Sequence, residues 1–185
     1  HIEQGHSNPA ASPFVRATLK GIRRRHGRPV KPKAAISLET LSKMLKACPL
    51  TLAGLRDRAI LLLGFAGAFR RAELASLTRE DVAVSEEGVR LTIRRAKADQ
   101  EGRGGQLAIP RSLSALCPVA ALDDWLSASG ITSGAIFRPF SKSGRLLDGA
   151  LTGKSIAAIV KHYAEEVGLD ADEIGAHSLR SGVLT

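Results

Sequence analysis

One stretch, residues 55–78, constrains the fold more than any other part of the sequence, because its character changes in the middle. Residues 59–65 are nearly all apolar. On a helix this makes every face apolar, and such a helix must lie inside a domain. The run is too short to cross a membrane and is flanked by Arg58 and Arg70. It therefore predicts a central core helix.

Charge follows immediately after this predicted helix. Arg70 and Glu73 come just after the small residues Gly67 and Ala68. Residues three apart share a helical face, so the Glu73 carboxylate can hold the Arg70 guanidinium. An ion pair that closes the core explains this spacing as well as a functional arginine does. The spacing alone leaves both interpretations open.

The composition favours a polyanionic partner. The 185 residues carry a formal net charge of +9 and have a sequence pI of about 10.2, which attracts nucleic acid first and anionic membrane second. The sequence shows no membrane span and no signal peptide, so we expect no membrane partner. Its two cysteines make no disulfide framework, which favours a cytoplasmic protein. It opens at His1, which suggests an excerpt of a longer chain. Cys48 and Cys117 are expected to be reduced core thiols.

Residues 1–33 predict a basic helix and a linker. Ser12 and Pro13 form a helix start, and the helix is expected to continue to about His26. Residues 27–33 hold two prolines and cannot stay helical, so the predicted domains are 1–33 and 34–185. A basic face is often merely solvated, but here it runs into a basic linker, and we interpret both as contacts to nucleic acid. The cations concerned are Arg16, Lys20, Arg23, Arg24, Lys31 and Lys33.

Residues 34–185 predict a mainly helical α+β domain. Apolar stripes predict helices that begin after Ser37, at Pro118 and after Thr152. Trp125 and Tyr163 fall on apolar helical faces and are expected in the core. Only one region alternates between apolar and polar residues, and it predicts a small three-stranded antiparallel sheet. Its expected strands are residues 81–84, 89–95 and 106–109.

Three patterns resemble ligand sites without the required context. Residues 148–155 end in Gly-Lys-Ser like a P-loop, but no apolar strand precedes them. Residues 170–175 open like a calcium loop, but Ile174 replaces an oxygen ligand. The glycines in 102–105 lack the strand-to-helix context of a dinucleotide site. We expect no nucleotide, cofactor or metal, and ATP binding would test the rival interpretation of an NTPase.

A set of cations remains, each placed at the end of a predicted element: Arg70, Lys97, His177 and Arg180. Singly, each has a plain structural explanation. In this order, with an apolar helix before Arg70 and Lys97 in a hairpin turn, the set resembles the tyrosine recombinase, or phage integrase, family. The family's Arg-x-x-Glu-Leu box is similar to residues 70–74, and its His-x-x-Arg box is similar to residues 177–180.

The resemblance implies a chemistry for these positions. A tyrosine would attack a DNA phosphate, form a 3′-phosphotyrosyl link and free a hydroxyl that can reseal to another strand, without metal. Arg70 and Arg180 would bind the phosphate oxygens, Lys97 would be the general acid, and His177 would hydrogen-bond the phosphate or share the proton transfer. Glu73 would orient Arg70.

The resemblance also implies partners for the chain. Double-stranded DNA and further recombinase copies on that DNA would be bound, with Arg94 and Arg95 beside the lysine turn among the DNA contacts, and the protein would be associated with the nucleoid. The first residues look like the end of the core-binding domain that precedes the catalytic domain in this family.

One gap limits the resemblance. The family's later His or Trp and its nucleophilic tyrosine follow the His-x-x-Arg box, so we expect a piece that ends before the nucleophile and binds duplex DNA without cutting it. Tyr163 precedes that box. The alternative is a DNA-binding module of the same fold that never cuts. Convergence of Arg70, Lys97, His177 and Arg180 on one phosphate-sized spot would discriminate between the two.

Overall fold

The structure is a computed structural model that describes residues 8, 12–26, 34–93, 105–174 and 176–181. At positions 23, 176, 177 and 181 it describes the backbone alone. The chain divides into two compact units, residues 1–32 and 33–185. The predicted linker, Lys97, Arg94 and Arg95 lie outside the described residues.

The first unit contains helix α1 (Pro13–His26), with the bounds predicted from the sequence. Arg16, Lys20 and Arg24 are exposed along it. The apolar side chains of Leu19 and Ile22 are also exposed, so this helix buries little apolar surface within its own unit. Its assignment to a DNA-binding domain stays a prediction.

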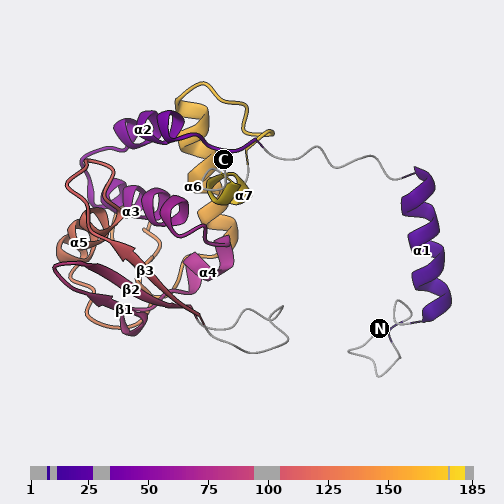
Figure 1. The fold of residues 1–185 in the computed structure, drawn as a ribbon, viewed down its shortest axis with the longest axis horizontal. Coiled ribbons are helices and arrows are strands. Elements are labelled where there is room, and N and C mark those ends of the chain that lie inside the picture. The colour runs from indigo at the N-terminus through magenta and orange to yellow at the C-terminus, as the bar shows by residue number, and fades with distance from the viewer. Residues whose placement is uncertain (1–7, 9–11, 27–33, 94–104, 175, 182–185) are drawn as a thin grey trace. The chain divides into compact units, whose positions relative to one another are not determined.

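The second unit is mainly helical, with one small sheet (Figure 1). Its helices are α2 (Leu38–Ala47), α3 (Leu52–Ala66), α4 (Arg71–Ser76), α5 (Pro118–Ser129), α6 (Gly153–Glu166) and α7 (Ala176–Ser181). Its strands are β1 (Val82–Val84), β2 (Gly88–Ile93) and β3 (Gly105–Pro110), and the 3-10 turn η3 (Arg79–Asp81) precedes β1. The strands pair antiparallel in the order β1-β2-β3. The predicted α+β class is thereby confirmed.

Helix α3 is the centre of this unit, as its apolar sequence requires. It packs against α2, α4, α5, α6 and α7, and the side chains from Ala59 to Leu63 are at most 2% exposed. Trp125 of α5 is fully buried, and its Nε1 donates to the Ile136 carbonyl at 2.8 Å. Within the described residues, no helix has the length and apolarity needed to cross a membrane.

The sheet follows the predicted alternation, with one change at its start. Val89 and Leu91 of β2 are buried, whereas Arg90 and Thr92 are exposed. The first strand begins one residue later than predicted, because Asp81 closes η3. Its carboxylate accepts hydrogen bonds from the Thr78 N–H at 3.0 Å and from the Thr78 hydroxyl at 2.8 Å, so the capping box in the sequence forms a turn before the strand.

A buried polar cluster joins α3 to α6. Arg56 binds Asp57 with Nη2–Oδ1 at 2.7 Å, and the Tyr163 hydroxyl donates to Asp57 Oδ2 at 3.1 Å. Burial raises the pKa of the Asp57 carboxyl, although Arg56 opposes the shift. Burial, and then the Asp57 charge, raise the pKa of the Tyr163 hydroxyl. Burial also raises the pKa of the neighbouring Cys48 thiol to about 11.

Candidate functional site

Arg70 follows α3 after a short turn and serves as the N-cap of α4. N-cap residues normally accept a hydrogen bond through a side-chain oxygen, and a guanidinium has no acceptor. Glu73 compensates, because its carboxylate accepts the Arg70 N–H at 2.9 Å and the Arg70 Nη1 donor at 2.7 Å. The Arg70 side chain is 57% exposed, whereas that of Glu73 is 11% exposed. A nearly buried carboxylate thus holds a guanidinium that faces solvent, and the predicted pair of Arg70 and Glu73 is present.

The backbone before Arg70 is strained. Ala68 has φ +46°, and no other non-glycine residue in the described ranges has a positive φ. An L-residue in the left-handed region costs about 1–2 kcal/mol. Strain of this kind concentrates at functional sites, where the surrounding structure holds it. The surrounding structure therefore holds the turn before Arg70 in this strained conformation.

Replacing Ala68 by glycine tests this strain. We expect Ala68→Gly to leave the free energy of unfolding unchanged or to raise it by up to about 1 kcal/mol, because the released strain exceeds the added chain entropy of roughly 0.4–1 kcal/mol. The matched control is Ala158→Gly, at an exposed position in α6, which should lose about 0.5–1 kcal/mol. Urea unfolding measures both, and equal losses in the two variants would contradict the assignment of strain.

Arg71 has a different environment from Arg70. A Cβ placed on Gly153, the first residue of α6, would lie 3.3 Å from the Arg71 Cγ. The aliphatic part of Arg71 therefore lies against the start of α6, where it contributes to the packing of α4 on α6. The register in which Arg70 is the functional arginine of the two stays a prediction.

Arg180 lies in α7, which packs against α3. Its side chain is half-buried. Ser178 and Leu179 are buried, and the Ser178 carbonyl accepts the Ile36 N–H at 3.0 Å. The segment before α2 therefore holds α7 by this hydrogen bond, and α3 packs against the same helix. The backbone of His177 lies in the same helix, but its side chain is outside the described set.

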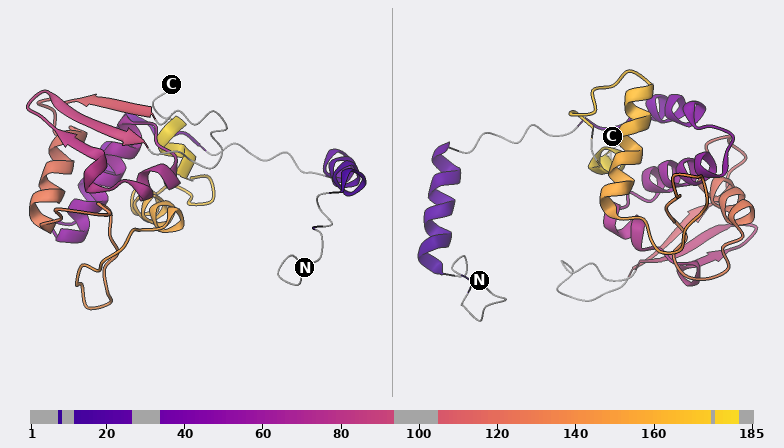
Figure 2. Two further views of the ribbon diagram at one scale, coloured as in Figure 1. Left: turned by 90° about the horizontal axis from the view of Figure 1, so that it is seen from below. Right: turned by 180° about the vertical axis from the view of Figure 1, so that it is seen from behind.

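Helix α4, which follows Arg70, and helix α7, which contains Arg180, both lie against Gly64 of α3. A Cβ on Gly64 would lie 2.9 Å from Leu179 Cδ1 and 3.4 Å from Leu74 Cδ2. Leu74 follows Arg70 by one helical turn, and Leu179 precedes Arg180. Helices α4 and α7 lie next to the same end of α3 in Figure 1 and in the right-hand view of Figure 2. Within the described residues, the fold thus brings the Arg70 and Arg180 segments to one end of the core helix.

The sheet approaches the same end of α3. A Cβ on Gly67 would lie 2.9 Å from Leu107 Cδ2, and the Phe69 ring is closer still. Leu107 pairs with Leu91, two residues from the point where β2 ends at Ile93 and β3 begins. The predicted lysine turn connects these strand ends. Leu107, two residues inside β3, contacts the turn before Arg70, and Lys97 itself is outside the described part.

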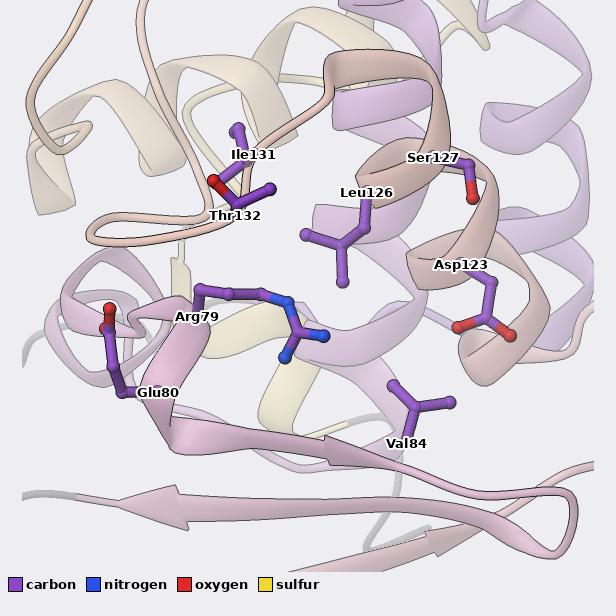
Figure 3. Close-up of a pocket in the computed structure, with 8 residues that line it drawn as sticks. All are labelled: Arg79, Glu80, Val84, Asp123, Leu126, Ser127, Ile131 and Thr132. Atoms are coloured by element: carbon purple, nitrogen blue, oxygen red, sulfur yellow. The ribbon is translucent and has the colours of Figure 1, made fainter.

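A separate cleft of about 770 Å³ lies between η3, the end of β1 and α5 (Figure 3). Its lining mixes Arg79 with Glu80 and Asp123, which does not suit a polyanion. Arg79 engages both backbone groups of Val82, because its carbonyl accepts the Val82 N–H and its Nη1 donates to the Val82 carbonyl at 2.8 Å. The residues that line this cleft include no predicted catalytic or DNA-binding residue.

Known structures identify the architecture. The lambda integrase catalytic core matches with a TM-score of 0.56 and 18% identity, over 82% of this chain and 81% of that chain. XerH site-specific recombinase bound to its difH substrate matches with a TM-score of 0.60 and 18% identity, over 84% of this chain and 43% of that chain. The fold, with an arginine held at the end of a buried helix, is that of a tyrosine recombinase catalytic domain.

The sequence comparison gives the family. Residues 35–185 match the model of the phage integrase family, and the chain belongs to that family. An integrase/recombinase XerD homolog from Selenomonas ruminantium is 42% identical over 190 residues, which cover 100% of this chain and 56% of that protein. The chain thus spans little more than half the length of this relative.

Proposed function

We propose that this chain is the catalytic part of a site-specific DNA recombinase that breaks and rejoins DNA through a 3′-phosphotyrosyl intermediate. The observation that carries the proposal is the Arg70 guanidinium, bound to Glu73 and exposed at the start of α4. Leu74 of α4 and Leu179 of the helix that carries Arg180 both lie against Gly64 of α3. Family membership and the similarity to a XerD homolog support it.

The proposed residues divide the reaction into two tasks. Arg70 and Arg180 bind the non-bridging oxygens of the scissile phosphate and stabilise the charge that grows there as the tyrosine oxygen attacks phosphorus. The bond from phosphorus to the 5′ oxygen breaks, and Lys97 donates a proton to that leaving oxygen. His177 hydrogen-bonds the phosphate or takes part in the proton transfer. The reverse steps reseal the strand.

Tyr163 is not the proposed nucleophile. It is 3% exposed and donates its hydrogen bond to Asp57 inside the core. The raised pKa of its hydroxyl also opposes formation of the phenolate that attacks phosphorus. The nucleophile is instead the tyrosine that the family resemblance places after the His-x-x-Arg box.

Duplex DNA is the proposed partner, held by phosphate contacts outside the reacting centre. Arg16, Lys20 and Arg24 are exposed on α1, and the remaining proposed DNA contacts are Arg23, Lys31, Lys33, Arg94 and Arg95. Further copies of the protein would assemble on the same DNA, as in the lambda integrase tetramer bound to a Holliday junction. We expect the protein to act on the nucleoid in the cytoplasm.

A trapping experiment tests the proposed activity. The full-length protein is incubated with a library of duplex DNA from its source, the mixture is denatured, and DNA covalently attached to protein is sequenced. We expect adducts at a defined site, and we expect them to persist in Tyr163→Phe. The yield of adduct should fall steeply between about 50 and 200 mM salt, because the protein holds DNA through phosphate contacts. DNA binding without any adduct would favour the non-cutting module. An adduct lost in a folded Tyr163→Phe protein would show that the nucleophile is misassigned.

A further inference from the structure

We propose that Gly64 is a positioning residue for the two arginines, because its missing side chain sets how closely α7 and α4 pack at the end of α3. This inference rests on the proposed recombinase function. It concerns a buried residue that touches neither DNA nor the reacting atoms, and that acts through Leu74 and Leu179.

The contacts at Gly64 leave no space for a side chain. Gly64, Leu74 and Leu179 are all buried. A methyl group on Gly64 would sit 2.9 Å from Leu179 Cδ1, closer than real Cβ contacts come, and 3.4 Å from Leu74 Cδ2. Close-packed interiors transmit such a displacement to their neighbours. An added methyl group must therefore displace the Leu179 side chain, and it would come into contact with the Leu74 side chain.

Each leucine is closely connected to one of the arginines. The Leu74 N–H donates to the Arg70 carbonyl at 3.0 Å, the first hydrogen bond of α4. Leu179 is bonded directly to Arg180 in α7. The Ile36 N–H donates to the Ser178 carbonyl, so a displacement of Leu179 at Gly64 acts on a short helix whose backbone is held at the preceding residue.

A glycine here has no conformational explanation. Gly64 lies in the last turns of α3 and does not have a positive φ. A glycine inside a helix is destabilising relative to alanine, so close approach of neighbouring elements is the gain that offsets this cost. A bidentate clamp on one phosphate tolerates only small errors in the placement of its guanidiniums, and Gly64 limits the spacing between Arg70 and Arg180.

The test compares two substrates in the full-length protein. The first is the duplex site identified by trapping with the wild type, and the second is the same duplex with a methylphosphonate at the scissile position. A methylphosphonate replaces one charged non-bridging oxygen by a methyl group, so the reacting centre needs less neutralisation by arginine. We expect Gly64→Ala to slow cleavage of the phosphate by about 10- to 100-fold, with DNA affinity within about twofold of wild type, and the deficit on the methylphosphonate to shrink below about threefold.

A matched control separates positioning from general loss of stability. Leu122→Val alters a fully buried residue of α5, on a helix that packs on α3 and β3. It should lower thermal stability without changing the ratio of rates on the two substrates. The double variant Gly64→Ala/Leu179→Val, which removes bulk opposite the added methyl group, should recover most of the phosphate cleavage.

The possible outcomes are distinct. Cleavage of the phosphate by Gly64→Ala at the wild-type rate, or an equal deficit on both substrates, overturns the inference and leaves the proposed function intact. Absence of cleavage by the wild type overturns the proposed function itself. If Gly64→Ala does not fold, the single variant Leu179→Val tests the inference. It loosens the same contact, so it should slow cleavage of the phosphate more than cleavage of the methylphosphonate, and equal effects would overturn the inference.

Discussion

Arg70→Lys should reduce strand cleavage by at least about 10²- to 10³-fold, the loss typical of removing one preorganised group that stabilises transition-state charge. Lysine keeps the positive charge but lacks the planar fork that binds two oxygens at once. DNA affinity should stay within a few-fold of wild type, because only one phosphate contact among many is altered. The measurement is the rate of covalent adduct formation by the full-length protein, with affinity titrated at the same salt concentration.

Arg71→Lys is the matched control for this experiment. It makes the same chemical change one residue later, where the aliphatic stem packs on Gly153 and lysine can keep that packing. Its cleavage rate should remain within a few-fold of wild type. Wild-type cleavage by Arg70→Lys, or a larger loss in Arg71→Lys, would show that the register of the arginine box is wrong.

Asp57→Ala should lower the free energy of unfolding by about 3–5 kcal/mol, because it leaves the Arg56 guanidinium buried without its carboxylate. The side chains of Arg56 and Asp57 are each only 10% exposed. Tyr163→Phe removes one hydrogen bond at 3.1 Å from the same carboxylate and should cost only about 1 kcal/mol. Urea unfolding measures both changes. A loss below about 1 kcal/mol in Asp57→Ala would contradict the role of this pair.

The pH dependence of stability gives a second test of Asp57. Burial raises the pKa of its carboxyl above the unfolded value, so the folded protein binds this proton more tightly. The associated stability is fully present below the unfolded pKa and is lost as the pH rises through the folded pKa. The stability of the wild type relative to the non-titrating Asp57→Asn variant should therefore decline with increasing pH over that interval.

Local patterns in the sequence predicted the elements well. Residues 59–65 are apolar on every face, and this alone required α3 to be central. Ser37 and Thr152 cap α2 and α6 through side-chain oxygens, and Gly130 ends α5 in the left-handed conformation. The interaction of Arg70 with Glu73 was also local, because it joins the N-cap residue of α4 to the third residue of the same helix.

Contacts between distant residues were not predictable in the same way. Tyr163 and Asp57 are 106 positions apart, and neither has a local pattern that selects the other as partner. Gly64 offered one signal, a glycine inside a core helix, but its partners Leu74 and Leu179 depend on how the helices pack. The placement of Lys97 and of the His177 side chain beside the two arginines stays a prediction.

The contact of Arg79 with Val82 has a consequence for the outer edge of the sheet. An outer strand with exposed amides and carbonyls is a template on which a strand from another chain can grow, and natural proteins block such templates. Here β1 has only three residues, and both the backbone N–H and the carbonyl of Val82 are hydrogen-bonded to Arg79 in the preceding turn. This edge of the sheet therefore offers no uninterrupted ladder on which a strand from another chain could pair.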